Sequence, residues 1–306
     1  MAIDVTKIPQ GTELVAKLGN YTVDDLIGSF KDDIEYLVKG KNEKNEDKDF
    51  TLYICKTSER WQEDFNAIKL VNKVQPLKEF ATFKSEGVHN EYQYMVFDNY
   101  PNDLRDMYKG REITPDEIRR VMQQLHNGLY HLDGAGIIHR DIQPRNLKIK
   151  HAGNFENFTL KIANFGSAVR YKTPIVDHHR VTLQYRSIEL LFCTENPKPA
   201  SDRWSAGCVM AELLKREPLF KASHQLEMIH KVFTLLGKPD KVWLEDKNLP
   251  LNSYICSDGY NEKPDFEKAI PRASKVEVGI LSTLLTYNPE KRNSFTEEER
   301  KYLRTA

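Results

Sequence analysis

The sequence lacks long hydrophobic runs, closely spaced cysteines and an excess of charge of either sign. No apolar stretch approaches the roughly 20 residues that cross a bilayer, and residues 1–20 contain no apolar core of a signal peptide. We therefore expect an intracellular protein, in the cytoplasm or nucleus, that does not bind membranes. The 45 basic and 45 acidic residues cancel, which argues against a nucleic-acid-binding surface. The four cysteines, at positions 55, 193, 208 and 256, are far apart, so neither a disulfide framework nor a zinc site is expected.

What the sequence does contain is a globular composition, with 306 residues of which 40% are hydrophobic and 29% charged. Runs rich in strand-forming residues occur at 34–38, 50–56, 80–83 and 91–97. The charged run 41–49, K-N-E-K-N-E-D-K-D, is interpreted as a solvated hairpin loop between the first two runs. Ser58 can cap a helix in which Trp61, Phe65 and Ile68 recur at helical spacing. This first part of the chain is expected to form strands and one helix.

Beyond Tyr100 the pattern becomes helical. Thr114 is suited to cap a helix that has Pro115 at its first position and acidic residues in its first turn. Further helical patterns begin at Ser201 and cover 226–236 and 276–285. A small strand-rich part followed by a larger helical part predicts an α+β, bilobed fold.

Five segments of the second part are similar to known motifs. They read I-H-R-D-I-Q-P-R-N at 138–146, K-I-A-N-F-G at 161–166, V-T-L-Q-Y-R-S-I-E at 181–189, S-D-R-W-S-A-G-C at 201–208 and L-T-Y-N-P-E-K-R at 285–292. In this order they resemble the motifs of eukaryotic protein kinases, and the third segment resembles the cyclin-dependent and MAP-kinase-like (CMGC) branch. The resemblance implies a kinase-like domain over 20–306 after an N-terminal extension at 1–19. The small lobe is expected at about 20–98, the hinge at 98–104 and the large lobe at about 105–306.

The resemblance also assigns candidate site residues. Asp141 matches the family's carboxylate that accepts the proton of the substrate hydroxyl group. Lys56 matches the strand lysine that binds the nucleotide phosphates. Asn146 and Asn164 match the two positions that hold magnesium. The nucleotide would be bound by Gly28, Ile54, Lys56, Phe97, Asp98 and Lys148.

Several of these positions depart from the family pattern. Asn164 replaces the aspartate that offers magnesium a carboxylate. Gln143 replaces the lysine beside the migrating phosphoryl group. The glycine-rich loop, expected at 26–38, keeps only Gly28, and Phe30 and Asp33 stand where further glycines are expected.

The adenine pocket and its neighbouring helix differ as well. Ile54 stands where the family has a small alanine, and Lys148 stands where it has an apolar floor residue. The helix glutamate that pairs with the strand lysine is either Glu63 or Asn66. We favour Asn66, which would leave Lys56 without its usual partner.

Two further features concern regulation and the scaffold. Asp177 stands where this branch carries an activating phosphorylation, and it either pairs with Arg140 or is a solvated loop acid. Glu189 and Arg292 match the family's buried ion pair of the large lobe. Scaffold residues are thus kept while residues that bind ATP and magnesium are replaced.

Three functions remain open on these grounds. The replacements favour a pseudokinase, a regulatory or scaffolding binder of other proteins with impaired phosphoryl transfer and no cofactor. The alternative is an active serine/threonine kinase that uses ATP and Mg²⁺ with Asp141 as the base. A third reading is a regulator that binds nucleotide without hydrolysing it. A cyclin partner is not expected, because the helix after Ser58 lacks a P-S-T-A-I-R-E-like segment.

Overall fold

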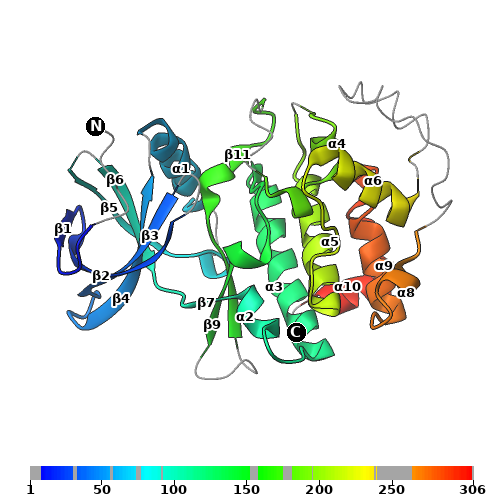
Figure 1. Cartoon of the computed structure of the whole chain (residues 1–306), viewed down its shortest axis with the longest axis horizontal. Helices are drawn as coiled ribbons and strands as arrows, with labels where there is room; N and C mark the ends of the chain where they lie inside the picture. Colours follow the sequence, from blue (N-terminus) through cyan, green and yellow to red (C-terminus); the bar gives the residue numbers. More distant parts are fainter. Residues whose placement is uncertain are drawn as a thin grey trace. The chain divides into compact units, whose positions relative to one another are not determined.

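The computed structural model divides into two compact units, Met1–Pro101 and Asn102–Ala306 (Figure 1). It describes residues 8–29, 33–55, 58–73, 77–90, 92–151, 158–174, 181–194, 196–237, 239 and 264–304. Four residues discussed above, Phe30, Lys56, Asp177 and Cys256, lie outside the described residues.

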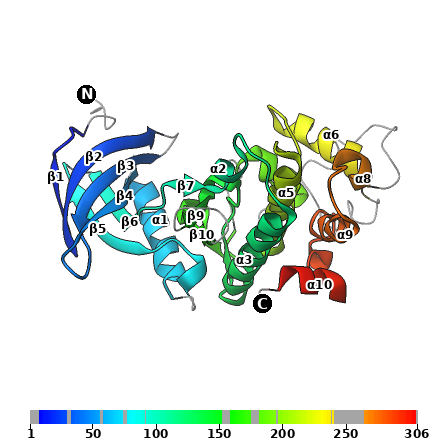
Figure 2. The same cartoon turned by 90° about the horizontal axis from the view of Figure 1, so that it is seen from below.

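The first unit is built around a closed barrel with the strand order β1-β2-β3-β4-β6-β5 (Figure 2). The strands are β1 Glu13–Ala16, β2 Gly19–Ser29, β3 Asp33–Lys41, β4 Asp47–Cys55, β5 Phe83–His89 and β6 Tyr92–Asp98. Phe50, Leu52 and Ile54 alternate along β4 and are buried in one core cluster inside the barrel. The strands predicted at 34–38, 50–56 and 91–97 are confirmed as β3, β4 and β6.

Two parts of the barrel differ from the sequence prediction. Residues 77–79 form a short 3₁₀ helix and β5 begins only at Phe83, so the strand predicted at 80–83 is wrong. Strand β1 lies within the predicted extension 1–19; it pairs with β2 and, through Ala16 and Gly87, with β5. This range therefore supplies the strand that closes the barrel.

Helix α1, Ser58–Val71, begins at the predicted residue and packs on β4 and β6. Its Trp61 and Phe65 rings stack with centroids 4.5 Å apart. Phe65 contacts Phe83 at 6.0 Å, and Phe83 contacts Phe97 at 5.6 Å. This chain of aromatic rings attaches the helix to the outside of the barrel.

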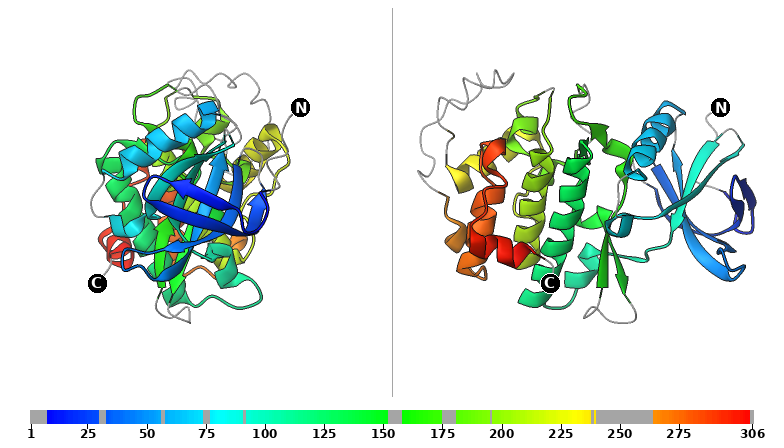
Figure 3. Two further views of the ribbon diagram at one scale, coloured as in Figure 1. Left: turned by 90° about the vertical axis from the view of Figure 1, so that its left-hand side faces the viewer. Right: turned by 180° about the vertical axis from the view of Figure 1, so that it is seen from behind.

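The second unit is mainly helical, with α3 and α5 side by side (Figure 3). The helices are α2 Leu104–Tyr108, α3 Pro115–Gly134, α4 Ile188–Leu191, α5 Ala200–Lys215, α6 Gln225–Leu236, α8 Phe266–Ala269, α9 Lys275–Leu284 and α10 Glu297–Leu303. As predicted, Thr114 caps α3, where it forms a capping box with Glu117. Because α5 contacts both α3 and α9 and is buried over most of its length, it forms the centre of this unit.

Two small sheets position the loops that carry the candidate site. Strands β7 Asn102–Asp103, β9 Leu147–His151 and β10 Phe158–Ile162 form one sheet in the order β10-β9-β7. Strands β8 Ile137–Ile138 and β11 Val169–Arg170 form the other. Residues 139–146 thus connect β8 to β9, and residues 163–168 connect β10 to β11. None of the helices in the described ranges has the length and hydropathy needed to cross a membrane.

Candidate functional site

The loop 139–146 is anchored by the first turn of α5. The backbone N–H groups of His139 and Arg140 donate to the two carboxylate oxygens of Asp202, at 2.7 and 2.8 Å. Burial raises the pKa of Asp202 to about 6 and lowers the pKa of His139 to about 4. Arg140 has a φ of 68°, a conformation that a non-glycine residue holds only when its surroundings fix it. The loop therefore has a defined position within the second unit.

The Asp141 carboxylate is buried and accepts hydrogen bonds on both oxygens. Its Oδ1 accepts from Gln143 Nε2 at 2.9 Å and from Thr182 Oγ1 at 2.9 Å. Its Oδ2 accepts from Asn146 Nδ2 at 2.6 Å. Gln143 Nε2 also donates to Thr182 Oγ1 at 2.7 Å. Gln143 thus connects Asp141 and Thr182, but its neutral amide adds no positive charge.

The two residues that flank Asn164 in the chain, Ala163 and Phe165, both contact His139. The His139 ring nitrogen Nε2 lies 3.0 Å from the Ala163 carbonyl oxygen, and its ring lies 4.9 Å from that of Phe165. Asn164 itself has φ 61° and ψ 70°. Its Nδ2 donates to Asn146 Oδ1 at 3.3 Å. The structure therefore brings together Asp141, Asn146 and Asn164.

These side chains do not form a good magnesium site. Mg²⁺ prefers oxygen ligands, carboxylates above all, in a strict octahedral arrangement. The side-chain oxygen of Asn146 is turned towards the amide hydrogens of Asn164, and neither side chain is charged. Within the described ranges, no group of three or more His, Cys, Asp or Glu side chains is arranged to hold a metal ion. The donor set present here does not fit Mg²⁺.

In the first unit, Ile54 and Phe97 do not share the pocket that the resemblance assigns to them. The ladder between β4 and β6 pairs Thr51 with Phe97 and Ile54 with Tyr94. Side chains alternate along a strand, so Ile54 faces the barrel interior while Phe97 lies on the opposite face with Thr51. Ile54 is accordingly buried in the core cluster. The prediction that both line one pocket is wrong for this pair.

Tyr53 is the residue of β4 whose ring contacts that of Phe97. The two rings lie 5.3 Å apart at 86°, an edge-to-face contact. The ring of Tyr53 therefore packs against the ring of Phe97 on the same face of the sheet. The sequence analysis did not single out Tyr53. The face of the sheet on which a residue of β4 lies depends on how β4 pairs with β6, and the motif alone does not reveal this pairing.

The other predicted nucleotide contacts in this unit have partners within the barrel. Gly28 on β2 lies opposite Glu35 on β3. The Asp98 carboxylate, at the end of β6, is 2.7 Å from Lys48 Nζ and 3.8 Å from Lys84 Nζ. Both lysines belong to neighbouring strands, so Asp98 takes part in an ion-pair network of the first unit.

Lys148 lies in the second unit on β9, between Asp103 of β7 and Lys161 of β10. It is half-buried, and the Asp103 carboxylate beside it is bound by Arg105 at 2.5 Å. A lysine at this position brings positive charge to a strand where the resemblance implies apolar surface.

Among the α1 side chains whose burial the structure describes, the buried carboxylate is neither of the two predicted candidates. Glu63 and Asn66 are exposed, and Asn66 accepts a hydrogen bond from Gln62 at 3.1 Å. Asp64, by contrast, is only 4% exposed. Because Asp64 follows Trp61 by three residues, helical spacing alone could have placed it on the packed face of the helix.

Glu189 and Arg292 form a bidentate ion pair in the second unit, with both N–O distances 2.7 Å. Both side chains are buried. Arg292 also donates to the carbonyl of Ala200 at 3.1 Å and lies over the Trp204 ring at 5.0 Å. The pair connects α4 and the chain after α9 to the central helix α5.

Comparison with known proteins agrees with this architecture. The family model for the protein kinase domain matches residues 37–302. The chain therefore belongs to the protein kinase family. This membership, with the relatives described next, confirms the predicted α+β kinase-like fold and its CDK- and MAP-kinase-like branch.

The similar proteins are kinases of several eukaryotes. Cyclin-dependent kinase G1 of Arabidopsis thaliana is 35% identical over 220 residues, which cover 67% of this chain and 35% of that protein. Cyclin-dependent kinase 11 of Dictyostelium discoideum is 35% identical over 208 residues, which cover 66% of this chain and 56% of that protein. The chain thus spans between about a third and just over half of these relatives. The crystal structure of the yeast RNA Pol II CTD kinase CTDK-1 complex matches with a TM-score of 0.72 at 26% identity, covering 87% of each chain.

Proposed function

We propose that this protein keeps a kinase scaffold but transfers phosphate poorly, and that it acts as a regulatory or scaffolding binder of other proteins. One observation carries the proposal. The two positions that the family uses to hold magnesium form a neutral amide pair, Asn146 and Asn164, in which amide hydrogens face the available oxygen.

The size of the missing effect supports impairment. A catalytic metal contributes several kcal/mol to stabilising the charge that develops during the reaction. Every ~1.4 kcal/mol changes the rate tenfold, so losing half of that contribution costs orders of magnitude. Gln143 places a neutral amide beside Asp141, where the resemblance implies a lysine.

A specific observation favours the alternative, an active serine/threonine kinase. The carboxylate of Asp141 is oriented by three side chains, Gln143, Asn146 and Thr182, and an oriented carboxylate is what a general base needs. Under this alternative, ATP and Mg²⁺ are required and Asp141 accepts the proton of a protein hydroxyl.

A thermal-shift experiment with ATP, with and without Mg²⁺, separates these functions. A ligand far above its Kd stabilises a protein by ~2–4 kcal/mol, which is readily seen as a rise in Tm. We expect no rise at millimolar ATP under either condition. A rise that requires Mg²⁺ would favour the active kinase and contradict the proposal. A rise that is equal without Mg²⁺ would instead support nucleotide binding without catalysis.

The identity of the partner protein is also a proposal. The sequence of the helix after Ser58 favours the absence of a cyclin partner. Several relatives are named cyclin-dependent kinases, however, and these names favour a cyclin-type partner. We therefore include cyclins among the candidate protein partners of this chain.

A further inference from the structure

The outer face of the barrel carries exposed apolar side chains around β1. Val15 on β1 is 71% exposed, and Val88 on β5 is 61% exposed. Because Ala16 pairs with Gly87 in this antiparallel ladder, the register places Val15 opposite Val88. Leu18, in the turn after β1, is 76% exposed. We call Val15, Leu18 and Val88 the β1 patch, and apolar side chains gathered in this way commonly mark a protein contact.

The direction of the patch follows from the alternation of side chains along its strands. Leu14 and Ala16, the neighbours of Val15, are buried in the core cluster. On β5, a Cβ added at Gly87 would meet the side chain of a core tyrosine, so Val88 at the next position lies on the opposite face. Both valines therefore point away from the barrel interior.

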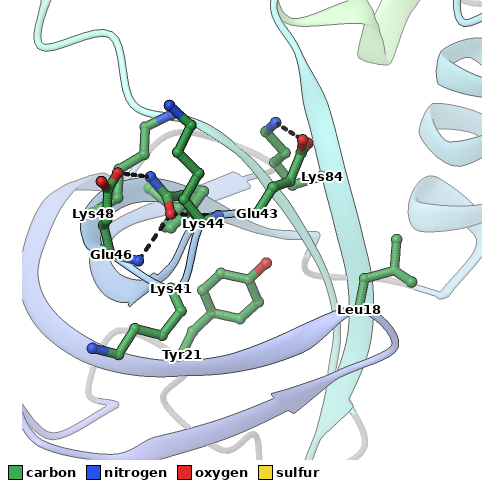
Figure 4. A pocket seen from close by; sticks show the side chains of 10 residues that line it. Leu18, Tyr21, Lys41, Glu43, Lys44, Glu46, Lys48 and Lys84 are labelled. Atoms are coloured by element: carbon green, nitrogen blue, oxygen red, sulfur yellow. Dashed lines mark hydrogen bonds and ion pairs between the residues drawn. The ribbon is translucent and has the colours of Figure 1, made fainter.

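The patch is distinct from the charged pocket of the same unit. Leu18 borders a pocket of about 430 Å³, whose other lining residues are mostly charged (Figure 4). In this lining Lys41, Lys48 and Lys84 already form ion pairs with carboxylates of the first unit. The pocket thus has internal partners for these charges, whereas the apolar side chains of the β1 patch are open to solvent.

The charges on β1 are placed symmetrically around Val15. Glu13 lies two residues before Val15 and Lys17 two residues after it, and both are exposed. The backbone N–H of Lys17 donates to the Glu86 carbonyl at 2.9 Å, which extends the strand alternation to residue 17. A twofold axis through Val15, perpendicular to the strand, would bring Glu13 of each copy opposite Lys17 of the other. The face is therefore complementary to itself.

Both charged groups can take a second partner. Lys17 Nζ lies 3.5 Å from Glu86 Oε1, and the Lys17 side chain is 72% exposed. Glu13 Oε1 accepts a hydrogen bond from Thr22 at 2.9 Å, and its other oxygen has no hydrogen-bond partner in the described part of the chain. Exposed ion pairs contribute little free energy, so the charges would fix the register while apolar burial supplies the affinity.

We propose that the β1 patch is the interface of a symmetric homodimer, in which the outer sheet faces of two copies pack on each other with their β1 strands antiparallel. Val15 contacts Val15 of the second copy, and Val88 contacts Val88. Tight dimers bury roughly 1,200–2,000 Å² or more, and a patch of three apolar residues is smaller than this. We therefore expect a dissociation constant of roughly 10–100 µM. The inference concerns assembly and does not depend on whether the chain transfers phosphate.

Sedimentation velocity of the full chain, from about 1 µM to about 300 µM, tests the proposal by mass action. We expect the sedimentation coefficient to rise with concentration from that of a monomer to that of a dimer. Val15→Lys should abolish this rise, because two like charges then lie together at the axis. The matched control is Leu226→Lys, since Leu226 is a 54% exposed aliphatic residue of α6 in the second unit. A wild-type chain that stays monomeric, or equal association of the two variants, would overturn the proposal.

The variants Glu13→Lys and Lys17→Glu test the twofold arrangement itself. Each change alone places like charges opposite each other in the dimer and should weaken association about tenfold. In an equal mixture, a chain with one change meets a chain with the other in opposite-charge pairs at both contacts, so a heterodimer of near wild-type affinity should form. Thermal unfolding of each variant checks that the barrel is intact, and mixing cannot repair a defect within one chain. A mixture that associates as weakly as the single variants would contradict the proposed interface.

Discussion

Gln143 donates to the Asp141 carboxylate at 2.9 Å and to the Thr182 hydroxyl at 2.7 Å, yet it carries no charge. Asn164 likewise bonds to Asn146 without offering a carboxylate. Both side chains are held by hydrogen bonds, and both are neutral.

This distinction leads to a prediction for the double variant Gln143→Lys with Asn164→Asp. We expect no recovery of phosphate transfer, because the two changes restore charge near Asp141 but leave Tyr53 beside Phe97 and Lys148 on β9. The measurement is transfer of radiolabel from ATP to a general protein substrate, with each single variant as a control. Transfer by the double variant that disappears on adding Asp141→Asn would refute this expectation.

Among the elements, the contact between α5 and α9 depends on a residue without a side chain. A Cβ added at Gly207 would lie 2.9 Å from Leu284 Cβ and 3.0 Å from Leu285 Cδ2. Although alanine favours a helix by up to ~1 kcal/mol over glycine, overpacking a core typically costs ~1–3 kcal/mol. Gly207→Ala should therefore lower the free energy of unfolding, as measured by urea denaturation.

The control for this variant is Gly134→Ala at the end of α3, where an added Cβ meets nothing within 4 Å. This change should be neutral or raise the stability by up to ~1 kcal/mol. If both variants shifted the urea midpoint in the same direction, the close packing of α5 on α9 would not be what Gly207 provides.

Elements with strong local signals could be predicted from the sequence. The Thr114 cap with Pro115 gave the start of α3, and the spacing of Trp61, Phe65 and Ile68 gave α1. Strands β1 and β2 were not predicted. The sequence of β2 contains adjacent acidic residues, and the role of β1 in the barrel depends on its pairing with β5. Such pairing is long-range and leaves little trace in local sequence.

In the candidate site, too, some residues could be predicted from local sequence and others could not. Asp141, Asn146 and Asn164 come from contiguous motifs, and the structure brings them together. The positions of Ile54 and Phe97 depend on the register between two strands, and a shift of one residue exchanges the faces of a sheet. For that reason the sequence could not show that Tyr53 accompanies Phe97.

At the scale of the whole molecule, the two units differ in the structural features that they contain. The second unit keeps its internal supports, the Glu189–Arg292 pair and the bonds from Asp202 to the loop that carries Asp141. The first unit closes its barrel with β1 and has a pocket of about 430 Å³ whose lining includes four lysines and two glutamates.

The most direct test of the central claim is transfer of radiolabelled phosphate from Mg-ATP by the purified full chain, with Asp141→Asn in parallel. We predict incorporation no greater than that of the Asp141→Asn variant, both into added protein substrates and into the chain itself. Robust incorporation that Asp141→Asn abolishes would contradict the account and identify the protein as an active kinase.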